Sequence, residues 1–479
     1  MTVDLRDRRV LVVGLGRSGT AAARLCAARG ARVTVTDSRD AAALGPSLAA
    51  LPAGVQRELG GHQTASFTGA ELIVLSPGVP EIPALIAARR AGVAVTGELE
   101  LASHFIEASM VAITGTNGKS TTTTLCGTIL AGTGAPTFVG GNLGQPLAEA
   151  VATPAGGAGG YCVVEASSFQ LETTDTFRPR VAVLLNVTAD HLDRHAGLDG
   201  YAAAKARIFR AQRRDAFAIV NADDALAMRV SDGIAAPRLT FSVAGTPAAE
   251  PRAGGAWISG DALIVRLPGG RDEAYPGHLP SLMGRHNQAN ALAALLAGRL
   301  AGASEAEARR GLLAFRALPH RMELVAEQDG IAYFDDSKGT NVGAVVAALA
   351  GFPRRVVLIA GGRDKGGDYA PLAETLASVG RGVVLIGEAA DRIAASLAAT
   401  VPGGPGAPLP VARAASMEEA VAAAVRLARP GDAVVLSPAC SSFDMFRDYQ
   451  HRADVFRAAV GALPGATGAT VPGGEATSS

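Results

Sequence analysis

A glycine-rich segment between a predicted strand and a predicted helix carries the residue types that bind phosphate groups. It reads Ile113-Thr-Gly-Thr-Asn-Gly-Lys-Ser-Thr121 and overlaps the apolar run Val111–Thr114. Glycines let successive backbone N–H groups face an anion, a lysine neutralises phosphate charge, and a serine hydroxyl can bind Mg²⁺. Ile113 stands where the usual phosphate loop has its first glycine, so the motif is a shortened variant. The pattern predicts ATP binding; the alternative, an ordinary turn with a chance Lys-Ser pair, is disfavoured by the flanking strand and helix.

Two further side chains are predicted to reach the same place. Glu165 ends the strand-like run Cys162–Glu165, and His191 follows the run Val181–Asn186 by a short loop. The carboxyl ends of parallel strands meet at one edge of a sheet, where ligands bind. A carboxylate there can bind Mg²⁺ beside Ser120, and His191 can bind a second ion or hold an incoming group. Each residue alone is more often solvated or a helix cap, but their common position beside the phosphate loop favours a metal site.

The predicted helix Gly200–Arg210 carries a lysine on an apolar face. Lys205 lies one turn from both Tyr201 and Phe209. This spacing predicts that the lysine is partly buried. Burial favours the neutral amine, which can react with CO₂ to form a carbamate, an anionic metal ligand. The alternative is an ordinary lysine that extends its ammonium group to water.

The N-terminal segment contains a glycine fingerprint typical of dinucleotide binding. Gly14-Leu-Gly16-Arg-Ser-Gly19 follows the strand-like run Arg9–Val13, and Asp37 closes the next one. The glycines specify a tight turn and the close approach of a diphosphate, without specifying a nicotinamide. A simple dehydrogenase does not need a separate triphosphate loop, so another nucleoside diphosphate is the favoured ligand. Ser76-Pro-Gly-Val79 follows a further strand-like run at the same edge and either completes that pocket or forms a plain turn.

Strand-like runs alternate with alanine-rich helical patterns along the whole chain. This order predicts an α/β protein with mostly parallel sheets, and a length of 479 residues suggests about three domains. We expect a Rossmann-like domain at 1–97, a P-loop ATPase-like domain at 98–317, a Rossmann-like domain at 318–465 and a flexible tail at 466–479, each domain having a sheet flanked by helices. The predicted strands are Arg9–Val13, Arg32–Thr36, Leu72–Leu75, Val111–Thr114, Cys162–Glu165, Val181–Asn186, Ala216–Val220, Val356–Ala360, Val383–Ile386 and Ala433–Leu436, and the predicted surface loops are Thr153–Gly160 and Gly245–Gly255.

The composition limits the kinds of partner and compartment. Lys plus Arg and Asp plus Glu both total 44, so no overall charge attracts nucleic acid or anionic lipid. The four cysteines are scattered without a CxxC pair, which argues against structural zinc and for a reducing compartment. The N-terminus is charged where a signal peptide would be apolar, and no apolar run has the length of a membrane span. We therefore expect a soluble, cytoplasmic protein.

Taken in order, several motifs resemble those of the Mur ligase family and span all three expected domains. They are Gly14–Gly19, Asp37 and Ser76-Pro-Gly; Thr114–Thr121; Glu165-Ala-Ser-Ser-Phe-Gln170; Asn186-Val-Thr-Ala-Asp-His191-Leu-Asp; Lys205; Gly284-Arg-His-Asn287-Gln-Ala-Asn290; His320-Arg321; Asp336-Ser-Lys338-Gly-Thr340-Asn341; and Ser437-Pro-Ala-Cys-Ser-Ser-Phe-Asp-Met-Phe446. The last motif, together with the nucleotide-like first domain, is similar to that of the member that adds D-glutamate to UDP-N-acetylmuramoyl-L-alanine.

The resemblance implies an ATP-dependent, ADP-forming ligase of cytoplasmic peptidoglycan precursor synthesis that works through an acyl phosphate. It implies that the enzyme uses ATP and two Mg²⁺ ions and acts on UDP-N-acetylmuramoyl-L-alanine and D-glutamate. It further implies a monomer that neither binds nucleic acid nor inserts into a membrane. The implied catalytic residues are Lys119, His191, Lys205 and Arg321. The implied ATP contacts are Gly115, Thr116, Asn117, Gly118, Lys119, Ser120, Thr121, Asn290, Arg321, Asp336 and Lys338, and the implied metal ligands are Ser120, Glu165, His191 and a carbamylated Lys205. The implied contacts of the UDP substrate are Arg17, Ser18, Asp37, Ser38, Ser76, Asn142 and Gln170, and those of D-glutamate are Thr340, Lys365, Ser442 and Tyr449, of which Tyr449 stands where the family pattern has phenylalanine.

Other interpretations make different predictions. A ligase that adds glutamate to folate shares the second and third domains but lacks a full nucleotide-binding first domain. Family members that add L-alanine, a diamino acid or a dipeptide differ mainly at Ser437–Phe446 and in the first domain. A nucleotide-switched binding protein would hydrolyse ATP without an amino acid, and a dehydrogenase would change the absorbance of a nicotinamide.

Overall fold

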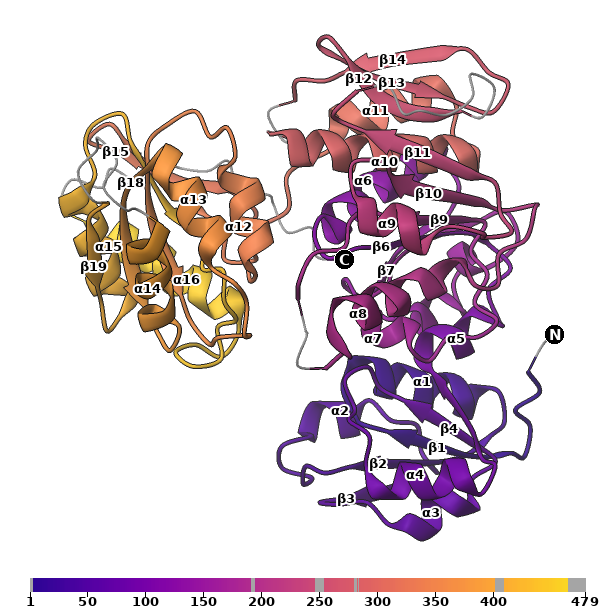
Figure 1. Cartoon of the computed structure of the whole chain (residues 1–479). Coiled ribbons are helices and arrows are strands. Elements are labelled where there is room, and N and C mark those ends of the chain that lie inside the picture. The colour runs from indigo at the N-terminus through magenta and orange to yellow at the C-terminus, as the bar shows by residue number, and fades with distance from the viewer. Residues whose placement is uncertain are drawn as a thin grey trace. The chain divides into compact units, whose positions relative to one another are not determined.

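The computed structural model describes residues 3–190, 194–245, 254–279, 282, 284–400 and 409–463 (Figure 1). The chain forms two compact units. The first contains Met1–Val187 and Asp199–Phe315, and the second contains Thr188–Leu198 and Arg316–Ser479. No described helix is both long enough and apolar enough to cross a lipid bilayer.

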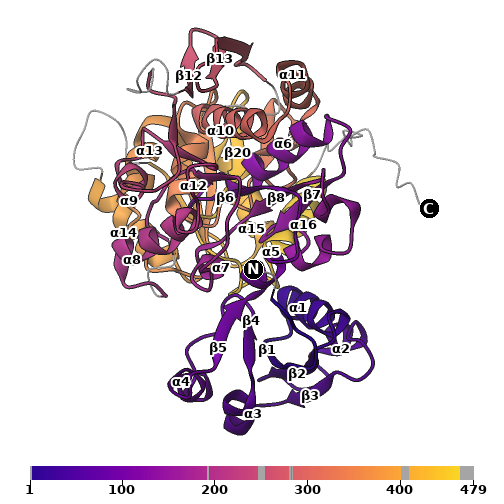
Figure 2. The same ribbon diagram turned by 90° about the vertical axis from the view of Figure 1, so that its right-hand side faces the viewer.

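The first sheet, in the first unit, has five parallel strands in the order β3-β2-β1-β4-β5. Apolar runs such as that of β1 suit a parallel sheet, which is covered on both faces. Val10 and Val12 of β1 belong to the core that contains α1, whereas Leu11 and Val13 belong to the core that contains α3 and α4 (Figure 2). The elements are β1 Arg9–Val13, α1 Arg17–Ala28, β2 Arg32–Asp37, α2 Gly45–Ala49, β3 Gln56–Leu59, α3 Thr64–Gly69, β4 Leu72–Leu75, α4 Pro83–Arg90 and β5 Ala94–Gly97.

The second sheet, in the same unit, has nine strands in the order β14-β13-β12-β11-β10-β9-β6-β8-β7. Helix α10 is buried along most of its length and packs against α6, the helix that follows the phosphate loop. The strands are β6 Ser109–Thr114, β7 Thr137–Gly141, β8 Tyr161–Glu165, β9 Val181–Leu184, β10 Phe217–Asn221, β11 Arg238–Ser242, β12 Gly255–Ser259, β13 Ala262–Arg266 and β14 Asp272–Pro276. The helices are α5 Glu98–Ser103, α6 Lys119–Ala131, α7 Ser168–Leu171, α8 Gly197–Ala206, α9 Ala225–Val230, α10 Arg285–Ala301 and α11 Glu305–Ala314.

The third sheet, in the second unit, has six strands in the order β15-β16-β20-β17-β18-β19. One face packs against α12, α13 and α14, and the other against α15 and α16. The elements are β15 Glu323–Gln328, β16 Ile331–Asp335, α12 Val342–Leu349, β17 Val356–Gly361, α13 Ala370–Val379, β18 Gly380–Ile386, α14 Ala390–Thr400, β19 Val411–Arg413, α15 Met417–Leu427, β20 Ala433–Leu436 and α16 Tyr449–Gly461.

The predicted α/β class with mostly parallel sheets is confirmed, with two antiparallel exceptions. Strands β12, β13 and β14 form an antiparallel meander, and β15 pairs antiparallel with β16. The predicted helix Gly200–Arg210 is α8, which starts three residues earlier and ends in a 3₁₀ turn at Arg207–Phe209. A short 3₁₀ turn, Pro154–Gly156, lies within the predicted loop Thr153–Gly160.

Each of the three sheets falls within one of the expected segments 1–97, 98–317 and 318–465. The boundaries themselves stay a prediction. Most of the predicted loop Gly245–Gly255 and the whole tail 466–479 lie outside the described residues, although Gly255 begins β12.

A buried carboxyl group lies where the chain passes from the first sheet to the second. Glu98 is the first residue of α5, is 1% exposed, and accepts a hydrogen bond from the Ala148 backbone N–H at 2.6 Å. Its Oε2 has no hydrogen-bond partner among the described residues. Burial raises the pKa of Glu98 to about 7. The group therefore takes up a proton near neutral pH.

Glu98→Gln should remove a pH dependence of stability. Between a carboxyl pKa of 4.5 in the unfolded chain and about 7 in the folded one, the native state binds more protons, so wild-type stability falls as pH rises. The variant should match the wild type at about pH 4 and exceed its free energy of unfolding by on the order of 2–3 kcal/mol at about pH 8. Urea unfolding at both pH values measures this difference. A difference that does not change with pH would contradict the prediction.

Candidate functional site

The predicted phosphate loop joins β6 to α6 and is held in shape by a neighbouring loop. The Asn117 backbone N–H donates to Asn186 Oδ1 at 2.8 Å, and Asn186 Nδ2 donates back to the Asn117 carbonyl at 3.0 Å. Lys119 Nζ donates to the carbonyls of Gly115 and Thr116, at 2.9 and 2.8 Å. These bonds place the ammonium group over the loop, ahead of a thirteen-residue helix whose N-terminal N–H groups favour anions.

Asn290, predicted from the motif on α10 to contact ATP, lies against this loop. Gly118 has a φ of 84° and precedes α6, and a Cβ at this position would lie 2.2 Å from Asn290 Oδ1. The same Oδ1 accepts a hydrogen bond from Thr122 Oγ1 at 3.3 Å. The structure thus brings residues that are far apart in the sequence together at one turn, and Gly118 is required there both for its backbone angle and for its lack of a side chain.

Gly118→Ala should therefore lower ATP-dependent turnover by on the order of 10²-fold, because the added methyl group must displace Asn290 or the loop. Gly134→Ala is a matched control, since Gly134 has the same φ of 84° but no atom within 4 Å of an added Cβ. The control should keep turnover within about twofold of wild type, as it shares the backbone strain without the clash. Steady-state phosphate release measures both variants, and equal losses would contradict this account.

Glu165 lies beside the phosphate loop and has one carboxylate oxygen available for a cation. It pairs with Ile113 across the neighbouring strands β8 and β6, and it is 3% exposed. Oε1 accepts a hydrogen bond from Asn142 Nδ2 at 2.7 Å, whereas Oε2 is buried without a hydrogen-bond partner in the described part of the chain. Ser120, the other predicted Mg²⁺ ligand of this pair, is also buried. An unpaired buried carboxylate oxygen and a buried serine hydroxyl are oxygen ligands of the kind that Mg²⁺ prefers. His191 lies outside the described residues.

Lys205 is buried, as its spacing predicts, and the burial is more complete than expected. It is 1% exposed, and its Nζ donates to the Gly115 carbonyl at 2.7 Å. The ring of Tyr201 lies under the same nitrogen, 4.3 Å from ring centroid to Nζ. Lys205 therefore reaches the phosphate loop from α8, and the alternative of an ammonium group extended to water is wrong.

A cavity of about 260 Å³ collects five of the seven residues predicted to contact the UDP substrate. These five are Arg17, Ser18, Ser76, Asn142 and Gln170. The cavity is lined by the start of α1 and by the loop after β4, both of which lie at the carboxyl edge of the first sheet. Asn142 and Gln170 come from the second sheet's segment, so the cavity joins two parts of the first unit.

Asp37 and Ser38 do not line this cavity. Asp37 Oδ2 accepts a hydrogen bond from the Leu15 backbone N–H at 2.7 Å and pairs with Arg39 at 2.8 Å. Hydrogen bonds from Arg39 hold the pKa of Asp37 well below its usual range. In this structure Asp37 stabilises the glycine turn, while Ser38 is exposed.

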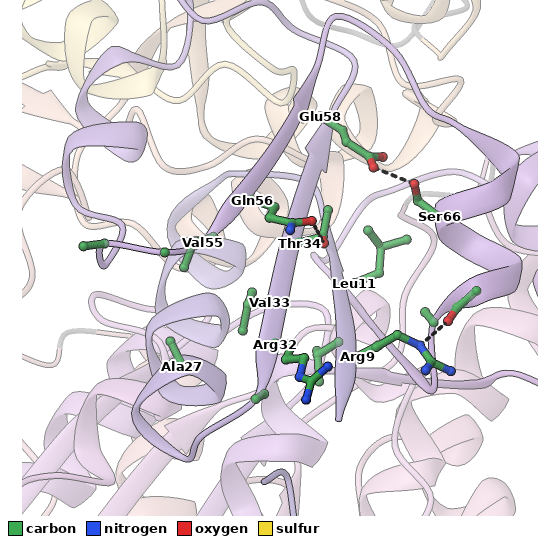
Figure 3. Close-up of a pocket in the computed structure, with 16 residues that line it drawn as sticks. Arg9, Leu11, Ala27, Arg32, Val33, Thr34, Val55, Gln56, Glu58 and Ser66 are labelled. Atoms are coloured by element: carbon green, nitrogen blue, oxygen red, sulfur yellow. Dashed lines mark hydrogen bonds between the residues drawn. The ribbon is translucent and has the colours of Figure 1, made fainter. Parts of the chain in front are cut away.

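A larger cavity of about 610 Å³ lies elsewhere in the first sheet (Figure 3). Its lining includes Arg9, Arg32 and Gln56, the first residues of β1, β2 and β3. Ligands of open α/β sheets bind at the carboxyl ends of the strands. None of the residues predicted to bind a ligand lines this cavity, and we assign it no role.

The second unit holds the remaining predicted ATP contacts, with Arg321 before β15 and Asp336 and Lys338 after β16. Asp336 is buried and accepts a hydrogen bond from Ser437 Oγ at 2.5 Å. Burial raises the pKa of Asp336 to about 6, against the opposing effect of the nearby Arg321 charge. Arg321 Nε is buried without a hydrogen-bond partner among the described residues. Lys338 Nζ lies 5.7 Å from the ring centroid of Tyr449, which places the predicted ATP and D-glutamate contacts side by side.

The backbone is strained on both sides of Arg321. His320 and Met322, on either side of it, have φ values of 62° and 45°, in the region that favours glycine. The His320 ring lies 2.7 Å from Asp335 Oδ2, and its backbone N–H donates to Glu323 at 2.9 Å. Strained residues held by such contacts cluster at functional sites. The sequence has no glycine at these positions and therefore carries no signal of the turn.

Lys365, Thr340 and Ser442 follow strand ends of the third sheet, as the predicted D-glutamate site requires. Lys365 Nζ lies 3.5 Å from Asp190 Oδ1, and Asn341 Nδ2 donates to Asp190 Oδ2 at 3.3 Å. Sequence reasoning assigned no role to Asp190. Its position next to His191 in a quoted motif was the available signal.

Comparison with known proteins identifies the family. The Mur ligase MurD-like N-terminal domain matches residues 8–97, the Mur ligase middle domain matches 113–298, and the Mur ligase glutamate ligase domain matches 320–440. The chain belongs to the Mur ligase family. Among Mur ligases, it is 50% identical over 461 residues to UDP-N-acetylmuramoylalanine--D-glutamate ligase of Anaeromyxobacter dehalogenans, covering 95% of this chain and 97% of the relative. It is 48% identical to the enzyme of the same name from Pelobacter propionicus, covering 96% and 100%.

Solved structures of Mur ligases share the fold. MurF ligase from Thermotoga maritima, in complex with ADP, has a TM-score of 0.57 at 16% identity, with 95% of each chain covered. A pseudomurein peptide ligase type C from Methanothermus fervidus has a TM-score of 0.56 at 20% identity, covering 90% of this chain and 96% of that one. The predicted fold class of three mostly parallel sheets flanked by helices is confirmed by these matches.

Proposed function

We propose that this Mur ligase uses ATP to join D-glutamate to UDP-N-acetylmuramoyl-L-alanine in peptidoglycan synthesis. The observation that carries the proposal is the 50% identity, over 95% of the chain, to a relative named for this reaction. The buried phosphate-loop geometry supports it, because Lys119, Asn290, Glu165 and Lys205 all lie at or beside one turn.

The chemistry requires a carboxylate to become a better acyl donor. The L-alanyl carboxylate of the first substrate attacks the γ-phosphorus of ATP and forms an acyl phosphate with release of ADP. The D-glutamate amine then attacks the carbonyl carbon, and phosphate leaves as the amide forms. The first step brings two anions together, so it requires positive charge, which Lys119 and Arg321 would provide.

The side chains present suit the metal sites that the family resemblance implies. Ser120 and the unpaired Oε2 of Glu165 would hold one Mg²⁺, and His191 with a carbamylated Lys205 would hold a second. Metal ions held by these residues would supply positive charge to offset that of the phosphate groups. The burial of Lys205 favours an uncharged amine able to take up CO₂. The residues of the phosphate loop orient the triphosphate through backbone N–H groups.

The cavity of about 260 Å³ is our proposed site for part of the UDP substrate. Arg17 and Ser18 open α1, a twelve-residue helix, and would meet the diphosphate at its N-terminus. Asn142 and Gln170 would lie nearer the muramoyl group. Asp37 and Ser38 stay predicted contacts of the uridine part.

The second unit would supply the remaining contacts. Asp336 and Lys338 would meet ATP, together with Arg321. Thr340, Lys365, Ser442 and Tyr449 would hold D-glutamate. Lys365 is the cation suited to a substrate carboxylate, and Ser442 supplies a hydroxyl.

Phosphate release measured with UDP-N-acetylmuramoyl-L-alanine, ATP and a panel of amino acids tests the function. D-glutamate alone should support release, and L-glutamate, L-alanine and a diamino acid should not. Release without any amino acid would instead favour a nucleotide-switched binding protein. Release with another amino acid would favour a different member of the family.

We also propose a cytoplasmic monomer. The four cysteines are free and buried, which agrees with a reducing compartment. Light scattering of the purified chain checks the monomer, and cell fractionation checks the compartment.

A further inference from the structure

Two loops at the carboxyl edge of the third sheet are in contact with each other. One follows β17 and carries Lys365, and the other follows the neighbouring strand β20 and carries Ser442. The Arg363 backbone N–H donates to the Ser441 carbonyl at 2.9 Å, and Ser441 Oγ donates to the Arg363 carbonyl at 3.3 Å. The two backbones are therefore held together at Arg363 and Ser441 by one main-chain hydrogen bond and one hydrogen bond from the Ser441 hydroxyl.

One buried hydroxyl bridges the two loops beside their main-chain contact. Tyr369, at the start of α13, is 3% exposed, and its hydroxyl lies 2.8 Å from Asp364 Oδ1 and 3.2 Å from Cys440 Sγ. A hydroxyl has a single proton and a carboxylate can only accept, so the hydroxyl donates to Asp364 and accepts from the thiol. Burial raises the pKa of Cys440, which keeps the thiol proton available.

Asp364, which accepts the Tyr369 hydroxyl, also fixes the backbone on either side of Lys365. Its Oδ1 also accepts the Gly366 backbone N–H at 3.0 Å, so Lys365 is the middle residue of a turn closed by the Asp364 side chain. Arg392 of α14 pairs with Asp364 and lies over the Tyr369 ring, 5.6 Å from its centroid. Asp364 is thereby held from two sides.

We propose that the Tyr369 hydroxyl is a positioning group for D-glutamate binding, because it sets the Lys365 turn relative to the loop that carries Ser442. The inference rests on the proposed function and adds to it a residue that itself meets no substrate. The Arg363–Ser441 contacts remain when the hydroxyl is removed, and Arg452 still donates to the Cys440 carbonyl. The loops should therefore stay folded while the Lys365 turn loses its fixed position relative to the loop that carries Ser442.

Tyr369→Phe should raise KM for D-glutamate about fivefold to tenfold, the effect of one lost hydrogen bond. The KM values for ATP and for the UDP substrate should stay within about twofold, and kcat should change less than KM for D-glutamate. Tyr333→Phe is the matched control, because Tyr333 is a buried tyrosine of β16, in the same unit, and lies outside the proposed sites. All kinetic values of that control should match wild type.

A double-mutant cycle with Cys440→Ala separates positioning from a general loss of structure. If the Tyr369–Cys440 contact matters, Cys440→Ala should also raise KM for D-glutamate, and the double variant should be no worse than Tyr369→Phe alone. Equal rises in all three KM values, or an unchanged KM for D-glutamate, would overturn the inference. If Tyr369→Phe does not fold, Cys440→Ser and Cys440→Ala provide the test. Cys440→Ser keeps a hydrogen-bond donor, so its KM for D-glutamate should lie closer to that of the wild type than the KM of Cys440→Ala. Equal KM values for the two variants would overturn the inference.

The wild-type assay distinguishes this outcome from failure of the proposed function. If wild type shows no phosphate release that depends on D-glutamate, the function is wrong and no conclusion about positioning is needed. If wild type is active and the variants behave as wild type, the function stands and the inference is wrong.

Discussion

Lys119→Ala is expected to lower ATP-dependent phosphate release by on the order of 10³-fold. The side chain brings a fixed positive charge to the loop, where Gly115 and Thr116 carbonyls hold its ammonium group. The loss should appear in kcat as well as in KM for ATP, because charge on the transferred phosphoryl group is stabilised most in the transition state. Steady-state phosphate release at saturating UDP substrate and D-glutamate measures it.

The fold should survive this substitution. Asn186 still holds the loop through Asn117, and Gly115 keeps its hydrogen bond from Lys205. Thermal melting should therefore be close to wild type. Lys119→Arg restores the charge on a larger, planar group, so it should recover activity only in part. Turnover of Lys119→Ala within about tenfold of wild type would remove Lys119 from the phosphate site.

Lys205→Ala is expected to lose on the order of 10² to 10³ in turnover and to recover part of it with added formate or acetate. In the proposed state, Lys205 carries a carbamate, and a small free carboxylate can take that position in the space the side chain leaves. Dose-dependent recovery of phosphate release measures the effect. Full activity without added carboxylate would remove the carbamate from the mechanism.

Lys205 is 1% exposed, so one variant controls for loss of packing and a second controls for the specificity of the rescue. Lys205→Met keeps a long side chain without an amine, so it should fold and be inactive, and the filled space should prevent rescue. Lys119→Ala should not respond to formate, because that site needs a cation. Rescue of all three variants alike would show that the carboxylate acts elsewhere.

The distribution of lysine supports these assignments. The chain has four lysines, Lys119, Lys205, Lys338 and Lys365, and every other residue among its 44 Lys and Arg is arginine. All four are proposed site residues. A surface cation can be either residue, whereas a carbamate requires an amine and a phosphate loop suits a compact ammonium. The four lysines of this chain therefore all stand at positions where the proposed chemistry uses an amine or an ammonium group.

The local sequence was sufficient to predict those parts of the site whose geometry is determined by a single helix, strand or loop. The phosphate loop could be predicted because glycine spacing, Lys119 and the strand before it lie in one short segment. The burial of Lys205 followed from its spacing to Tyr201 and Phe209 along one helix. Strand β15 was missed because most of its residues are only partly buried, so it lacks the apolar run that marked the central strands.

Long-range contacts required the tertiary structure. The approach of Asn290 to Gly118 depends on how α10 packs against α6, and the Asp190–Lys365 and Tyr369–Cys440 contacts join residues far apart in the sequence. The sequence by itself determined the fold class, the phosphate loop and the chemistry available at the strand ends, because these depend on short-range periodicity and residue type. Only the tertiary structure decided which of these side chains meet, because a meeting between distant segments depends on strand order and helix packing, which no local pattern encodes.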